Sequence, residues 1–144
     1  MKEYITNSVE ETIAAAEEVA ASLSAGDIIL YEGDMGAGKT HFTKGIAKYL
    51  GIDDEITSPT FALVNEYYGD VPLFHFDLYR IESYDDLYAI GFFDYLDRGG
   101  IIAAEWSENI AELKGELGDV ISVCIEKLSE TGRRITVSGK YFGD

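Results

Sequence analysis

The stretch from residue 28 to residue 50 constrains the fold of this chain more than any other part of the sequence. It starts with an apolar run at residues 28–31 and continues into a turn that contains Gly33, Gly36 and Gly38. Apolar residues then recur at the spacing of one helical face. A short apolar run predicts a buried strand, and the spacing after it predicts a helix. The sequence therefore predicts a strand, a glycine-rich loop and a helix in direct succession.

The turn has the pattern G-x-x-x-x-G-K-[ST], which Lys39 and Thr40 complete. Glycines allow a positive φ and a close approach of the backbone to a phosphate, because no Cβ is in the way. Amide groups at the start of the next helix point at the anion, and the helix dipole favours negative charge there. In this pattern the lysine reaches the β- and γ-phosphates and the threonine hydroxyl ligates Mg²⁺. We therefore expect the chain to bind a nucleoside triphosphate; the alternative is a glycine turn followed by an exposed lysine.

Length and composition favour one folded domain, since the chain has 144 residues of which 47% are hydrophobic. No apolar run approaches the roughly 20 residues of a membrane helix, and residues 1–8 lack the basic start and apolar stretch of a signal peptide. We therefore expect a cytoplasmic protein with no membrane contact. The formal net charge of −16 opposes stable direct binding to a nucleic-acid backbone, which depends on Lys and Arg, and suits a basic protein partner.

The remaining patterns predict further helices and strands. Ser8 and Glu11 have the spacing of a capping box, and the apolar periodicity after them predicts a helix over residues 9–24. Other helices are expected between Ser83 and Gly91, at residues 92–96 and, more weakly, at residues 110–117. Strands are expected at residues 61–68, 71–79, 101–105, 120–128 and 133–138, the first two and the last two forming hairpins. Together these elements predict a single α/β domain over residues 1–144, with a partly parallel sheet and antiparallel additions.

The segment H-F-D-L-Y-R at residues 75–80 starts within the second strand of the first of these hairpins. Side chains alternate across a strand, so His75, Asp77 and Tyr79 share one face. An edge strand can form without a carboxylate, a histidine and a tyrosine on one face. Their presence together therefore favours a functional role for this face. An exposed polar face with an aromatic back is an equally compatible interpretation.

The run I-I-A-A-E at residues 101–105 is apolar until its last residue, Glu105. Continuous apolar runs are typical of parallel strands that are covered on both faces. An acid at the carboxyl end of such a strand lies where nucleotide-binding folds place their ligands. Glu105 is thus similar to the acid of a Walker B strand, which supports the magnesium ion. The alternative is a charged residue where the chain leaves the sheet.

Four motifs occur in a characteristic order and at characteristic distances: residues 33–40, 58–61, 75–80 and 105–106. In this combination the chain resembles the TsaE (YjeE) family, bacterial ATPases that assist the synthesis of threonylcarbamoyladenosine in tRNA. The resemblance extends over nearly the whole chain. It implies a P-loop NTPase fold with a mostly parallel central sheet flanked by helices, and binding of ATP and Mg²⁺. It also implies docking onto the TsaD–TsaB complex, in which TsaD transfers threonylcarbamoyl to adenosine 37, and ATP hydrolysis that resets this complex.

The resemblance also implies roles for individual residues. Thr40 and Glu105 would ligate or support the metal, and Asp77 matches an acid required for activity. The phosphates would be held by Met35, Gly36, Ala37, Gly38, Lys39 and Thr40. Sequence does not decide whether Asp77 or Glu105 orients the attacking water.

Other positions match the family near the γ-phosphate and the base. Ser58 and Thr60 match a switch-like segment near the γ-phosphate. Arg133, and a residue near Asn7 or Ser8, match positions beside the nucleotide base. His41 departs from the family pattern, where a second threonine is common, and Ser107 stands where proline is common.

Two other classes of function share the phosphate-binding loop. A small-molecule kinase needs a lid with arginines near the transferred phosphate, and residues 80–98 offer little of that. A GTP-dependent switch needs a segment of the type N-K-x-D to recognise guanine, which the sequence lacks. With no evident arginine finger, we expect slow ATP hydrolysis by the isolated chain and faster hydrolysis on its partner complex.

Overall fold

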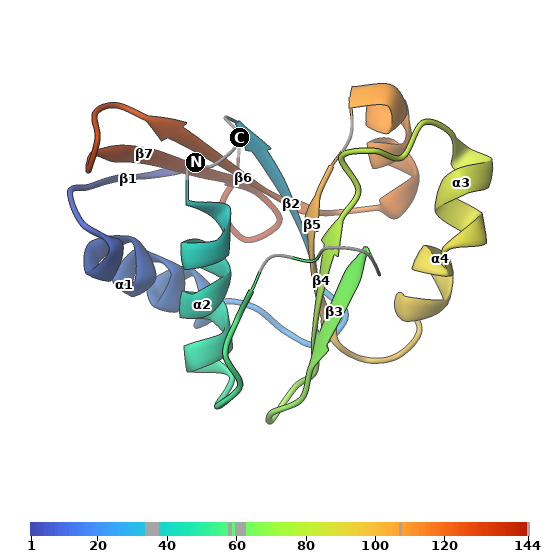
Figure 1. The fold of residues 1–144 in the computed structure, drawn as a ribbon, viewed down its shortest axis with the longest axis horizontal. Coiled ribbons are helices and arrows are strands. Elements are labelled where there is room, and N and C mark those ends of the chain that lie inside the picture. Colours follow the sequence, from blue (N-terminus) through green and yellow to red (C-terminus); the bar gives the residue numbers. More distant parts are fainter. Residues whose placement is uncertain (34–37, 58, 60–62, 107, 144) are drawn as a thin grey trace.

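The computed structural model describes the chain except for residues 34–37, 58, 60–62, 107 and 144. Its centre is a seven-stranded sheet with the order β1-β7-β6-β2-β5-β4-β3 (Figure 1). The strands are β1 (Lys2–Thr6), β2 (Ile28–Gly33), β3 (Val64–Tyr67), β4 (Leu73–Asp77), β5 (Ile101–Glu105), β6 (Ile121–Lys127) and β7 (Arg133–Gly139). The neighbours β6, β2, β5 and β4 are parallel, and β3, β7 and β1 are added antiparallel. The predicted mixed sheet with a parallel centre is therefore confirmed.

Helices cover both faces of this sheet (Figure 1). One face carries α1 (Val9–Ala20) and α2 (Lys39–Tyr49), and the other carries α3 (Tyr84–Ala89), α4 (Phe92–Tyr95) and the 3₁₀ segment η1 (Glu108–Leu117). Successive side chains of β2 point to opposite faces, so Ile29 packs in the core below α1 and α2 while Leu30 packs in the core on the other side. Among the helices of the described residues, none combines the length and the apolar character that crossing a bilayer requires.

The start of α1 follows its sequence signal, with one difference. The Ser8 hydroxyl accepts a hydrogen bond from the Glu11 amide at 3.1 Å, as a capping residue does. The Glu11 carboxylate reaches back to the Asn7 amide at 2.8 Å, one residue before the cap. The helix ends at Ala20 and not at residue 24, because the chain tightens there into three-residue turns.

Both predicted hairpins are present, although their strands are mostly shorter than expected. β3 pairs with β4, and β6 pairs with β7, in antiparallel register. The edge strand β1 was not expected from the sequence, because its K-E-Y-I-T segment has too little apolar alternation to predict a strand. It forms because β7 offers it a free edge, along which all five of its residues pair.

Helices α1 and α2 cross at Gly45, where there is no room for a side chain. A Cβ at this position would lie 2.4 Å from the Ala16 Cβ and 2.4 Å from the Ile13 carbonyl oxygen. We expect Gly45→Ala to lower the free energy of unfolding by about 1–3 kcal/mol, because overpacking outweighs the better helix propensity of alanine. Urea unfolding followed by circular dichroism measures this change.

The matched control is Gly115→Ala, in η1, where nothing lies within 4 Å of an added Cβ. Its unfolding midpoint should equal or exceed that of the unchanged chain. A Gly45→Ala variant as stable as this control would contradict the tight helix crossing.

Candidate functional site

The glycine-rich loop leaves β2 at Gly33 and enters α2 at Gly38. Both residues have a positive φ, of 108° and 112°, as expected for glycine. At Gly33 the neighbouring strand β6 adds a second reason for glycine, since a Cβ would lie 2.3 Å from the Ile125 carbonyl oxygen. The loop residues Met35, Gly36 and Ala37 lie outside the described residues, so their phosphate-binding role stays a prediction.

The first turn of α2 combines the positive end of the helix dipole with the charge of Lys39. Within the described part of the chain, no side chain caps this helix and no acidic residue lies in its first turn. Helix α1 differs in both respects, with Ser8 as its cap and Glu10 and Glu11 in its first turn. The amides and dipole at the start of α2, next to Lys39, therefore provide a site for an anion.

Three residues predicted as catalytic come together beside this helix end. Lys39, Asp77 and Glu105 line one pocket of about 190 Å³, together with Tyr79 and Arg80. The register of the parallel strands accounts for this, because Asp77 lies opposite Glu105 at the carboxyl ends of β4 and β5. The sequence motifs that suggested these residues are far apart along the chain, and the sheet brings them to one edge.

The two carboxylates are held differently. The Asp77 side chain accepts a hydrogen bond from the Tyr79 amide at 3.1 Å. The Glu105 side chain is 21% exposed, and its Oε2 atom lies 3.5 Å from Nε2 of His75. His75 is completely buried on the face that α2 covers, so the interpretation of an exposed polar face is wrong for this residue.

A buried hydrogen-bond network joins β2 to the start of α2. The Tyr31 hydroxyl lies 2.7 Å from the Thr43 hydroxyl, which donates to the Lys39 carbonyl at 2.9 Å. Burial strongly raises the pKa of Tyr31, so this hydroxyl stays neutral. The sequence analysis missed both residues; the available signal was a tyrosine at the end of an otherwise aliphatic buried run.

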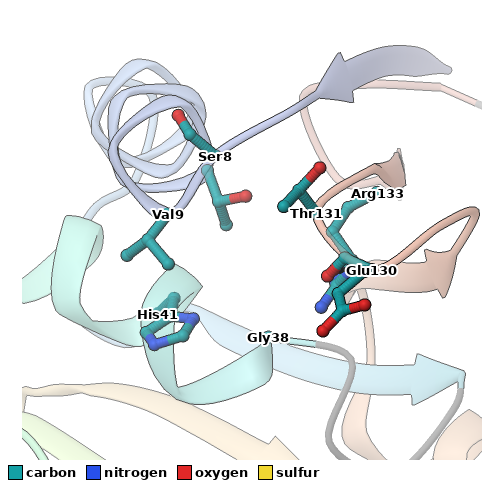
Figure 2. A pocket seen from close by; sticks show the side chains of 8 residues that line it. Ser8, Val9, Gly38, His41, Glu130, Thr131 and Arg133 are labelled. Atoms are coloured by element: carbon teal, nitrogen blue, oxygen red, sulfur yellow. Dashed lines mark hydrogen bonds between the residues drawn. The ribbon is translucent and has the colours of Figure 1, made fainter.

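A second pocket, of about 110 Å³, lies on the other side of the start of α2. Figure 2 shows its walls: the start of α1 and of α2 on one side, and the turn between β6 and β7 on the other. Its lining includes Ser8, Gly38, His41 and Arg133. Ser8 and Arg133, both implied to lie beside the base, are therefore brought together next to the loop.

The polar groups of this second pocket are partly engaged within the protein. Arg133 donates from Nη1 to carbonyl groups of its own turn, including that of Gly132 at 2.8 Å. The Ser8 hydroxyl serves as the helix cap. Burial, together with the positive charges of Lys44 and Arg133, lowers the pKa of His41 below its usual value. The pocket thus offers a neutral imidazole and a guanidinium at its walls.

The side-chain oxygen atoms at the sheet edge are of the kind that a hard cation such as Mg²⁺ prefers. The Thr40 side chain follows Lys39 in the first turn of α2, and Asp77 and Glu105 line the pocket that Lys39 also lines. In the described ranges, no group of three or more His, Cys, Asp and Glu side chains is arranged to hold a metal by itself. Mg²⁺ usually keeps several waters and binds phosphate oxygens besides one or two protein groups, so this set of ligands fits it.

Three further residues belong to the sequence motifs at residues 58–61 and 105–106. Ser58 and Thr60, the switch-like pair, lie outside the described residues, and their role stays a prediction. Trp106 is half-buried, with its ring packed against Phe92 and its Nε1 donating a hydrogen bond to the Ile110 carbonyl at 3.1 Å. It also lines a cavity with Lys39.

Comparisons with known proteins agree with one another. The family model described as "Threonylcarbamoyl adenosine biosynthesis protein TsaE" matches residues 6–135. The tRNA threonylcarbamoyladenosine biosynthesis protein TsaE of Aquifex aeolicus is 39% identical over 143 residues, which cover 97% of this chain and 98% of that protein. The protein of the same name from Bacillus subtilis is 40% identical over 128 residues, which cover 88% and 78%. The crystal structure of YdiB from Bacillus subtilis matches with a TM-score of 0.71 at 35% identity, over 96% of this chain and 84% of that one.

The Tyr31–Thr43 hydrogen bond gives a stability prediction. Tyr31→Phe removes one buried hydrogen bond and leaves the Thr43 bond to the Lys39 carbonyl in place. We expect a loss of about 1 kcal/mol in the free energy of unfolding. Urea unfolding measures it, with Tyr88→Phe as the control, since the Tyr88 side chain is 67% exposed. Equal unfolding midpoints for the two variants would mean that the network does not support the start of α2.

Proposed function

Because the chain belongs to the TsaE family of threonylcarbamoyl adenosine biosynthesis proteins, we propose that it binds and hydrolyses ATP in the synthesis of threonylcarbamoyladenosine in tRNA. The observation that carries the ATPase part of this proposal is one pocket that holds a lysine of the glycine-rich loop and two carboxylates from neighbouring parallel strands. This is the arrangement that phosphoryl transfer requires, because its catalysis is mostly positioning and charge stabilisation.

The triphosphate would bind at the start of α2. Lys39 would contact the β- and γ-phosphates, and the amides of the loop and of the first helical turn would donate to phosphate oxygens. The base would lie toward the pocket lined by Ser8, His41 and Arg133, on the other side of the helix end. A triphosphate running between the two pockets would thus point its γ-phosphate at Asp77 and Glu105.

The two carboxylates would have different roles at the γ-phosphate, one toward the metal ion and one toward the attacking water. Mg²⁺, held by the Thr40 hydroxyl and supported by Glu105, would neutralise charge on the phosphates. The Asp77 carboxylate, fixed by the Tyr79 amide, would be available to accept a hydrogen bond from the attacking water. Asp77 and Glu105 lie side by side on neighbouring strands, so one acid would face the metal and the other the nucleophile.

The surroundings of this pocket support slow hydrolysis by the chain alone. Arg80 lines the pocket, but its side chain is exposed to solvent, whereas Arg98 is engaged with Glu66. A partner that covered the pocket would exclude water and strengthen every charge interaction inside it. We propose the TsaD–TsaB complex as this partner, and the net charge of −16 fits a protein that docks on other proteins without gripping tRNA itself.

Replacing Lys39 tests both ATP hydrolysis and nucleotide binding. We expect Lys39→Ala to lower the rate of phosphate release from ATP by about 100-fold or more, because it removes a charge at the γ-phosphate. Lys48→Ala is the matched control, since Lys48 lies on the same helix and pairs with Glu17. Nucleotide binding is measured separately through the fluorescence of Trp106, the single tryptophan, which lines a cavity with Lys39. A Lys39→Ala variant that binds and hydrolyses ATP as the control does would remove the central assignment.

The partner complex tests the biological part of the proposal. We expect the isolated chain to release phosphate slowly and a mixture with TsaD and TsaB to release it faster, since the complex would cover the pocket. The measurement follows free phosphate with and without the complex, using Lys39→Ala as the blank. Equal rates with and without TsaD and TsaB would contradict docking at this site, and a phosphorylated metabolite in place of free phosphate would indicate a kinase.

A further inference from the structure

His75 is a buried polar residue with no hydrogen bond to the described part of the chain. The side chain is completely buried in β4, and neither Nδ1 nor Nε2 has a hydrogen-bond partner within the described residues. Buried polar side chains almost always have such partners, and an exception calls for an explanation in function or in an absent ligand. The mechanism described above makes no use of this imidazole.

The sheet directs His75 toward one acid of the site. In the β4–β5 register His75 lies opposite Ala103, whose small side chain leaves room for the ring. Glu105 follows two residues later on the same face, so it is the diagonal neighbour of His75. The ring also meets Tyr31 edge-on, with the ring centres 6.3 Å apart. Glu105 Oε2 is 3.5 Å from His75 Nε2, slightly beyond hydrogen-bonding distance.

Glu105 needs a group that fixes its orientation. Asp77 has such a group in the Tyr79 amide. For the Glu105 carboxylate, the described residues offer His75 as the near donor, and the longer glutamate side chain has one more rotatable bond to restrain. A movement of Oε2 by about 0.5 Å toward the ring would complete a normal hydrogen bond.

We propose that His75 is a positioning residue, which donates a hydrogen bond from Nε2 to Glu105 and holds that carboxylate toward the phosphate end of the site. Because the carboxylate is the acceptor, Nε2 carries the hydrogen and defines the tautomer. Because the imidazole is completely buried, it would act on the site through Glu105 and not by contact with a nucleotide. The role of His75 in hydrolysis rests on the function proposed above for Glu105. The tautomer of His75 can be tested independently of that function.

The tautomer is measured directly on the nucleotide-free protein. The chain has two histidines, His41 and His75, so ¹⁵N-histidine labelling gives two sets of ring signals, and His41→Gln assigns them. We expect the nitrogen shifts and ring couplings of His75 to show a hydrogen on Nε2. A His75 ring with a bare Nε2 would overturn the proposal, whatever the hydrolysis rate of the protein.

A pair of substitutions separates positioning from packing. His75→Leu fills the site without a donor; it gives up the hydrogen bond to Glu105 but also removes the unpaired Nδ1 atom, so its thermal midpoint should stay close to that of the unchanged chain. We expect its kcat for ATP to fall by about 10- to 100-fold with little change in KM, as when a carboxylate loses its supporting partner. His75→Gln, which can place an amide nitrogen near the Nε2 position, should recover part of this kcat. A folded His75→Leu variant with an unchanged kcat would overturn the proposal.

A double substitution shows whether His75 acts through Glu105. If it does, adding His75→Leu to Glu105→Gln should lower kcat little further, whereas independent effects would multiply and would contradict the proposal. If the unchanged protein hydrolyses no ATP, the proposed function fails, and the ¹⁵N measurement still decides the contact. That measurement also decides it if His75→Leu does not fold.

Discussion

The parallel pairing of β2 with β5 is the constraint on which the rest of the structure depends. Its register runs from Ile28 beside Ile102 to Tyr31 beside Glu105, so the acid ends up next to the strand that leads into the glycine-rich loop. β4 pairs on the far side of β5 and adds Asp77 at the same level. Side chains on both faces of these strands pack into apolar cores, so helices cover both faces. The carboxyl ends of the strands remain accessible, and ligands of such sheets bind there.

Helix α2 is held in place by two short-range contacts of different kinds. Gly45 lets it approach α1 closely, and the Tyr31–Thr43 hydrogen bond ties its first turns to β2. Lys39 is therefore placed relative to the sheet, and through the sheet relative to the carboxylates. Positioning of this kind matters because phosphoryl transfer depends on where charges lie when the reaction starts.

The two faces of the central strands differ in polarity. The face under α3 and α4 is packed with aromatic rings, among them Phe74, Phe76 and Phe92. The face under α2 carries Tyr31 and His75, and the buried Thr43 hydroxyl of α2 meets Tyr31 there. Burying an unpaired polar group such as His75 costs stability, and both Tyr31 and His75 lie two residues before the end of their strands, close to the site. His75 thus lies in the core and still comes within 3.5 Å of the Glu105 carboxylate of the site.

Local sequence signals determined the individual elements of this protein. The strand–loop–helix unit around Lys39, the cap at Ser8 and the buried strand that ends in Glu105 follow from patterns within a few residues, since propensity, capping and periodicity act over that range. Only the tertiary structure decided which elements meet. The pairing of β1, the opposition of Asp77 to Glu105 and the burial of His75 beside that acid depend on strand register between distant segments, which no local pattern encodes.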